Sequence, residues 1–255
     1  MRIDCHMHLS RGKQRWGYAA AQAVDAARRL GIDRFCASNL ATGIYVEADA
    51  VSRLNDPVLK AMRDFPDTVM GYCFVHPGWV RQAQDEITRC VVDGGMMGIK
   101  LYHQHFMDEP VMGPIIERCI DLGIPILMHA SYATDAALRE RQPRLSHAQH
   151  FVRAAQRYPE ALLIHGHLPG GGDWEWGLKW LRQAPSVYVD TSGSVIDQGV
   201  IERMVRELGA ERLLFGTDMQ YERGVGKILD ARITARQKRL IFGENMARVL
   251  SRRQA

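Results

Sequence analysis

Short apolar runs recur along the chain at regular intervals, and each is about as long as one strand. Most are continuous rather than alternating, which is typical of strands covered on both faces. The runs lie at residues 2–7, 33–38, 69–75, 97–101, 124–129, 161–167, 186–190 and 212–218. They predict eight buried strands.

Segments with helical spacing of apolar residues separate these runs. The clearest is residues 18–31, where Gly31 stands at the position at which helices commonly end. Others span residues 81–95, 113–123, 146–159, 194–209 and 228–242. Strand and helix thus alternate, which favours a single (β/α)₈ TIM barrel of the α/β class, one domain over residues 1–255. A doubly wound open sheet is the main rival, but the first predicted strand runs into SRGKQRWG without that fold's glycine-rich phosphate turn.

The composition narrows the class of protein. Hydrophobic residues make up 46% and charged residues 24% of the chain, as in ordinary globular proteins. We find no run near the roughly 18–20 apolar residues of a membrane span and no signal peptide, so we expect a cytoplasmic protein with no membrane partner. The net charge of +4 comes from scattered basic residues, which argues against a nucleic-acid partner. The five cysteines form no C-x-x-C pair, so neither a disulfide framework nor a thiolate zinc site is indicated.

Polar side chains stand at the ends of several predicted strands, where TIM barrels carry their catalytic groups. In DCHMH, His6 and His8 are two residues apart, so they share one face of a strand with Cα atoms about 6–7 Å apart. Two imidazoles at that spacing can converge on one metal ion. Further polar groups follow on the later strands: Lys100, His129, His165, His167 and Asp218.

Each of these residues also has an ordinary structural interpretation. His129 could be a core histidine bonded to a carbonyl group, Asp218 could cap a following helix, and Lys100 could lay its stem along apolar neighbours. Taken together, however, imidazole nitrogens and a carboxylate are the ligands of zinc and related divalent metals. The combination therefore predicts a metal centre at the barrel mouth.

These motifs resemble those of the amidohydrolase superfamily. The segments that carry the resemblance are DCHMH, GIKLY around Lys100, GIPILMHAS around His129, LLIHGHLPGG around His167 and LLFGTDM around Asp218. Their order and spacing match from Met1 to about Leu250. The chain is similar in particular to the branch of metal-dependent TIM-barrel hydrolases that also contains aminocarboxymuconate-semialdehyde decarboxylase.

The resemblance implies one or two divalent ions, with Zn²⁺ expected first and Mn²⁺ or Fe²⁺ as alternatives. Asp218 would take a proton from the activated water and return it to the leaving group, and His167 would stabilise the developing oxyanion. Lys100 stands where binuclear members carry a carboxylated bridging lysine, so the number of ions stays open. The implied ligands are His6, His8, Lys100, His129, His167 and Asp218.

The loops after the strands supply candidate substrate contacts. Arg11 and Trp16 in the first loop could hold an anionic, partly apolar substrate, although a solvated basic loop is an equal alternative. Tyr102 and His103 follow Lys100, and Trp174 follows a run of glycines. An open mouth could be completed by a homodimer or a larger homo-oligomer.

Three functions compete. The first is a metal-dependent hydrolase that cleaves an amide, lactone, ester or thioester bond of a small anionic substrate with a metal-activated water. The second is a lyase of the same family, a non-oxidative decarboxylase or a hydratase, whose metal ligands would be the same. The third is a barrel without catalysis, which we would expect to have lost some of these ligands. The hydrolase is the expectation carried forward.

Overall fold

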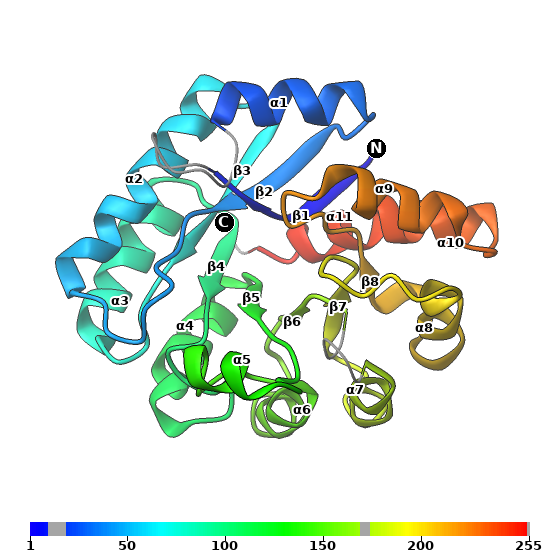
Figure 1. The fold of residues 1–255 in the computed structure, drawn as a ribbon. Helices are drawn as coiled ribbons and strands as arrows, with labels where there is room; N and C mark the ends of the chain where they lie inside the picture. Colours follow the sequence, from blue (N-terminus) through cyan, green and yellow to red (C-terminus); the bar gives the residue numbers. More distant parts are fainter. Residues whose placement is uncertain (10–18, 169–173, 254–255) are drawn as a thin grey trace.

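The parallel sheet closes on itself and carries the helices on its outside (Figure 1). The computed structural model describes residues 1–9, 19–168 and 174–253. Within them every neighbouring pair of strands is parallel, and the strand order is the chain order. The strands are β1 (Ile3–His8), β2 (Arg34–Ser38), β3 (Val69–Phe74), β4 (Gly98–Leu101), β5 (Ile126–His129), β6 (Leu163–Gly166), β7 (Tyr188–Asp190) and β8 (Leu213–Leu214). Backbone bonds from Cys5 N to Phe215 O and from Asp218 N to His6 O join the last strand region to the first. The prediction of a (β/α)₈ TIM barrel is confirmed.

Helices follow the strands and form the outer layer (Figure 1). They are α1 (Ala20–Arg29), α2 (Ala48–Asp64), α3 (Val80–Ile87), α4 (Gly113–Leu122), α5 (Ala136–Arg141), α6 (Ala148–Arg157), α7 (Trp174–Leu181), α8 (Val200–Leu208), α9 (Tyr221–Asp230), α10 (Ala235–Arg239) and α11 (Asn245–Leu250). Short π-helical turns, η1 (Thr88–Asp93) and η4 (Leu240–Glu244), continue α3 and α10, and 3₁₀ turns η2 (Pro110–Met112) and η3 (Ala210–Arg212) precede α4 and β8. None of the described helices combines the length and apolar character needed to cross a membrane.

Helix α2 shows how packing overrides a local signal. Its sequence contains Pro57, which lacks the backbone N–H that a helix interior uses and usually ends a helix. The helix nevertheless continues because Val51, Leu54 and Val58 form a buried stripe along one side. The segments predicted as helices from the sequence did not include Ala48–Asp64.

Two apolar cores position the site. The larger core lies between the strands and the helices, and the smaller one fills the barrel interior. Inward-facing Tyr72 and Leu214 share the smaller core with Met246 and Val249 of α11, so this helix closes the end at which the strands begin. The opposite end, at the carboxyl ends of the strands, is left for polar side chains.

We predict that Gly98→Ala destabilises the barrel by about 1–3 kcal/mol, as overpacking commonly does. A Cβ at Gly98 would lie 2.5 Å from the carbonyl oxygen of Pro125, which accepts the Ile99 N–H across β4 and β5. Gly226→Ala is the matched control, because a Cβ there meets nothing within 4 Å and alanine favours a helix. Urea unfolding of both variants measures the difference, and equal stabilities would contradict this account.

Candidate metal centre

An extra residue in β1 determines which side chains enter the barrel. Three steps along β1, from Asp4 to Met7, lie opposite two steps along β2, from Phe35 to Ala37. A bulge of this kind breaks the alternation of faces. Cys5 consequently belongs to the inner core, while the next residue, His6, also faces the barrel interior.

Asp4 holds this bulge together. Its Oδ1 accepts hydrogen bonds from the backbone N–H of His6 at 3.0 Å and of Thr217 at 3.1 Å, and its Oδ2 accepts one from the Thr217 hydroxyl. Burial raises the pKa of Asp4 to about 7, against these hydrogen bonds, which lower it. Asp4 therefore connects the bulge to the segment that carries Asp218.

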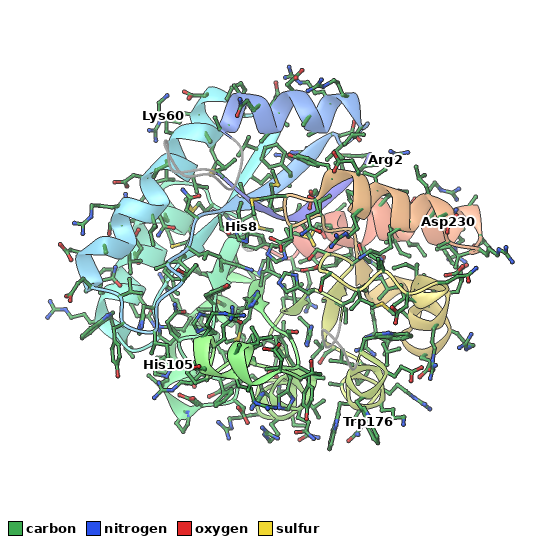
Figure 2. The ribbon with its side chains drawn as sticks, viewed as in Figure 1. Arg2, His8, Lys60, His105, Trp176 and Asp230 are labelled. Atoms are coloured by element: carbon green, nitrogen blue, oxygen red, sulfur yellow. The ribbon has the colours of Figure 1, made fainter. Side chains whose placement is uncertain are left out.

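Three ligand atoms converge beside the bulge. His6 Nε2 lies 3.3 Å from His8 Nε2, His8 Nε2 lies 3.4 Å from Asp218 Oδ1, and the third edge, from His6 Nε2 to Asp218 Oδ1, is 3.8 Å. Ligands at about 2.0–2.2 Å from one tetrahedral ion stand about 3.3–3.6 Å apart. The triangle has the size of one face of such a coordination sphere. Figure 2 shows His8 near the barrel centre, far from Trp176 on the outer layer.

The hydrogen bonds of the His6 and His8 rings leave a lone pair on each Nε2 atom, on the side that faces Asp218. His6 Nδ1 donates to Asp190 Oδ2 at 2.8 Å, and His8 Nδ1 donates to the Ser38 carbonyl at 3.1 Å, because these oxygens only accept. In the neutral rings each Nε2 then carries a lone pair that faces the Asp218 carboxylate. Burial, assisted by the charge of Lys100, holds the pKa of His8 well below its usual range, so this ring stays neutral. The donor set therefore fits a divalent cation.

Among the described residues, Lys100 is the cationic side chain that reaches this cluster. It is fully buried on β4, and its Nζ lies 2.9 Å from His6 Nε2. Burial lowers the pKa of Lys100 to about 8, although the carboxylates of Asp218 and Asp190 oppose the shift. A fully buried amine in this position balances part of the negative charge around the cluster.

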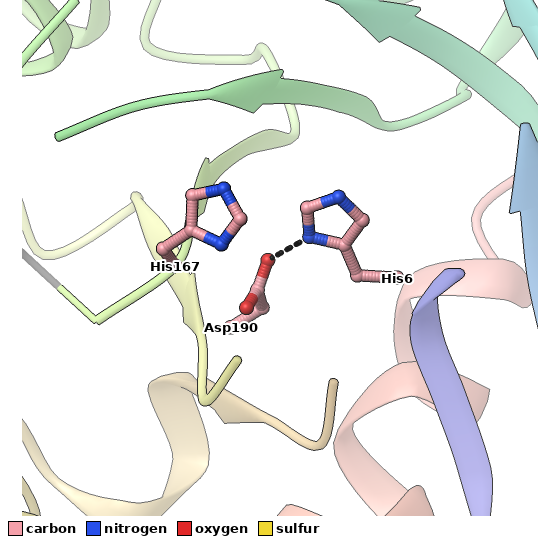
Figure 3. Close-up of side chains that lie close together, drawn as sticks. All are labelled: His6, His167 and Asp190. Carbon is pink, nitrogen blue, oxygen red and sulfur yellow. Dashed lines mark hydrogen bonds and ion pairs between the residues drawn. The ribbon is translucent and has the colours of Figure 1, made fainter. Parts of the chain in front are cut away.

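A second group of possible ligands shares His6 with the first. Figure 3 shows His6, His167 and Asp190 together, with the Asp190 carboxylate hydrogen-bonded to the His6 ring. Burial alone would raise the pKa of Asp190, but the charge and hydrogen bond of His6 hold it well below its usual range. Asp190 thus orients His6, as carboxylates behind metal-bound histidines commonly do. The candidate ligands predicted from the sequence did not include Asp190.

His129 lies on the other side of His167. Its Nδ1 is 2.7 Å from His167 Nε2, and its Nε2 is 3.2 Å from Gln142 Oε1. Gln142 in turn donates to the Tyr102 hydroxyl at 3.2 Å. The ligand groups within the described residues do not include His129, and its role as a ligand stays a prediction. No sequence motif marked Gln142.

The backbone is strained where the site is assembled. His167 and Asp218 have φ angles of 71° and 48°, a region that residues with a Cβ rarely occupy. Ser192 Oγ lies 2.9 Å from His167 Nδ1, and Asp218 Oδ2 lies 3.8 Å from the same nitrogen. Such outliers cluster at functional sites, where surrounding contacts maintain them.

A cavity of about 240 Å³ adjoins His129, His167 and Asp218. Leu138 and Val195 add apolar wall, and the described lining also includes small neutral polar groups.

The predicted substrate contacts are distributed differently. Tyr102 packs on the His129 ring, and buried His103 donates to the Thr42 carbonyl. Trp174 lies on α7 and donates to Asp197. Arg11 and Trp16 lie outside the described residues. All five stay predictions.

Comparisons with known proteins agree with this fold. The family model described as Amidohydrolase matches residues 3–252. Dihydroxybenzoic acid decarboxylase from Polaromonas, solved with bound manganese and 2-nitroresorcinol, gives a TM-score of 0.79 at 16% identity and covers 100% of this chain and 98% of that one. 5-Carboxyvanillate decarboxylase from Sphingomonas paucimobilis gives 0.78 at 17% identity, with 98% of each chain covered. 4-Oxalomesaconate hydratase from Rhodopseudomonas palustris gives 0.75 at 18% identity, with 99% and 96% covered.

These matches correct the expectation of a hydrolase, which is wrong. The enzymes that share the barrel are mainly decarboxylases, with a hydratase, and they favour the lyase alternative over hydrolysis.

We predict that the double variant His6→Ala, His8→Ala loses bound metal. Two of the three converging ligand atoms disappear, so the metal content per chain should fall to near zero in elemental mass spectrometry of protein purified without chelator. His147→Ala, which removes a histidine outside the ligand groups of the described residues, is the control and should keep its metal. Unchanged content in the double variant would rule out this triangle as the ion site.

We also predict an acid-sensitive contribution from His165. Its Nδ1 donates to the His167 carbonyl at 3.2 Å, and burial lowers its pKa from 6.5 to about 4. Between these pH values the unfolded chain binds a proton that the folded chain does not, so stability falls as pH falls. The loss of folding free energy between pH 7 and pH 4 should reach up to about 3 kcal/mol. His165→Gln keeps a donor and should show a flatter profile in denaturant titrations at pH 7 and pH 4; parallel profiles would refute the assignment.

Proposed function

Because the chain belongs to the amidohydrolase family, we propose that its barrel mouth binds a divalent metal ion and catalyses a lyase reaction, the non-oxidative decarboxylation of a small carboxylic acid. The observation that carries this proposal is the convergence of lone pairs from His6, His8 and Asp218 beside a cavity at the ends of the strands. The decarboxylases of the same fold support the choice of reaction.

His6 Nε2, His8 Nε2 and Asp218 Oδ1 would hold the ion. When bound, the ion would supply Lewis-acid binding of the substrate's oxygen atoms. Manganese is our first choice because one of the similar decarboxylases contains it, and zinc, expected from the donor types, is the alternative that elemental analysis distinguishes. Lys100, His129 and His167 are kept as further proposed ligands of one or two ions, with His129 on the same ion as His6, His8 and Asp218.

Asp218 presents its two oxygens to two different partners. Oδ1 faces His6 and His8, whereas Oδ2 faces His167 Nδ1 at 3.8 Å. We propose that Asp218 delivers a proton from Oδ2 to the substrate carbon, the bond from that carbon to the carboxylate breaks, its electron pair stays with the substrate, and CO₂ leaves. Water then returns a proton to Asp218.

The cavity supports a substrate with one ring or a short conjugated chain. Leu138, Leu168 and Val195 provide apolar wall, and Ser131 and Gln142 provide neutral hydrogen-bonding groups. Hydroxyl groups on the substrate fit these partners. His167 stays neutral because burial, with the charge of His6, holds its pKa well below its usual range, so it would orient the substrate by hydrogen bonding.

We keep the proposals of one domain over residues 1–255, a cytoplasmic location, a homodimer or larger homo-oligomer, and no nucleic-acid partner.

We predict that the Mn²⁺-loaded protein releases CO₂ from an ortho-hydroxylated aromatic acid. The panel contains dihydroxybenzoates and 5-carboxyvanillate as probes, and CO₂ release is followed by membrane-inlet mass spectrometry. Asp218→Asn, with its metal content verified, should lower kcat by about 10²–10⁴, the usual size of a general-acid effect. Addition of water to unsaturated acids in place of CO₂ release would reject decarboxylation in favour of a hydratase.

A further inference from the structure

Lys227 extends from the helix layer into the turn that follows β7. It lies on α9, and its Nζ donates to the carbonyl of Thr191 at 3.1 Å and points to that of Gly193 at 3.4 Å. The side chain is half-buried, and these two carbonyls stand on either side of Ser192. One amine on an outer helix therefore contacts two backbone carbonyls of the same turn at the barrel mouth.

The groups that hold the two inner histidines lie at the start of this turn: Asp190 is the last residue of β7, and Ser192 lies within the turn. Asp190 Oδ2 accepts from His6 Nδ1 at 2.8 Å, and Ser192 Oγ lies 2.9 Å from His167 Nδ1. The Ser192 N–H donates to Asp190 Oδ1 at 2.8 Å, which couples the two side chains to each other. A shift of the turn would thus move the partners of both histidines together.

The turn has little freedom on the side of His167. Gly193 has a φ of 89°, and a Cβ placed there would lie 2.9 Å from the His167 Cβ. Because the Gly193 backbone packs closely against the His167 side chain, a shift of this backbone would also shift the His167 ring.

Electrostatics also relates the amine to this turn. Burial lowers the pKa of Lys227 to about 8, and the Asp190 carboxylate opposes the shift, so the ammonium group lies within the field of that carboxylate. Arg223, exposed and one helical turn earlier on α9, acts on Lys227 in the opposite direction.

We propose that Lys227 is a positioning residue of the metal centre: by binding the Thr191 and Gly193 carbonyls, it fixes the turn that carries Ser192 and directly follows Asp190, the two residues that orient His167 and His6. The inference rests on the proposed metal centre, and it concerns a residue that touches neither the ligands nor the cavity of about 240 Å³. Its effect should therefore be seen in metal affinity, before any substrate is added.

The test is Mn²⁺ binding to the full chain, measured by isothermal titration calorimetry and by electron paramagnetic resonance of the bound ion. Lys227→Met removes both hydrogen bonds and should weaken Mn²⁺ binding by roughly 10-fold, the lower end of the range for groups that orient metal ligands. Arg223→Met removes a neighbouring charge but not these hydrogen bonds, and should bind Mn²⁺ as the wild type does. Lys227→Arg keeps the charge and the donors and should restore most of the affinity.

A structural role for Lys227 would have a different signature. Thermal unfolding of the metal-free proteins would then show a lower Tm for Lys227→Met with an unchanged Mn²⁺ affinity, and this result would overturn the proposal. If Lys227→Met does not fold, Lys227→Gln, which keeps a neutral donor, replaces it: weaker binding supports the proposal and wild-type affinity rejects it. Failure of the wild type to bind Mn²⁺ would reject the metal centre itself, whereas equal affinity in all variants would reject only the role of Lys227.

Discussion

The extra residue in β1 is the constraint on which the site depends. In a regular strand, Cys5 and His6 would face opposite sides, and the strand could not both fill the inner core and supply its first imidazole. The bulge turns both residues inward, and Asp4 stabilises it with hydrogen bonds from His6 and Thr217. Because Thr217 precedes Asp218, the same carboxylate fixes the distance between the first histidine and the last ligand. The inner core, the bulge and the triangle of His6, His8 and Asp218 are consequently formed by the same contacts.

The proposed metal centre depends on several hydrogen-bond acceptors around the two histidines rather than on any single residue. Asp190 accepts a hydrogen bond from His6 Nδ1, and the Ser38 carbonyl accepts one from His8 Nδ1. Each acceptor keeps the ring proton on Nδ1, away from Asp218. The near nitrogens then oppose a carboxylate at 3.4 and 3.8 Å, with the Lys100 amine nearby. In a buried environment such an arrangement is costly without a cation. The outer contacts that aim the lone pairs are therefore part of the proposed metal site, together with its ligands.

The sequence predicted the barrel and the positions of its polar strand ends because both depend on simple periodicity. Polar residues interrupt apolar runs at His8, His129 and Asp218, and such interruptions are visible without a structure. The bulge was not predictable, because DCHMH is equally consistent with a regular alternating strand. The partnership of Asp190 with His6 joins residues far apart in the chain, and Gln142 lies in a loop with no motif. The choice between hydrolase and lyase was also beyond the sequence, because both reactions use the same ligand types.

The positive φ angles at His167 and Asp218 have a consequence for how the protein can change. Each costs about 1 kcal/mol or more, which glycine would recover. Laboratory selection for thermal resistance alone would therefore favour glycine at the two positions where the proposed chemistry uses an imidazole and a carboxylate. A screen that enriches heat-resistant clones would accumulate inactive barrels, and activity must be selected in parallel to keep the chemistry.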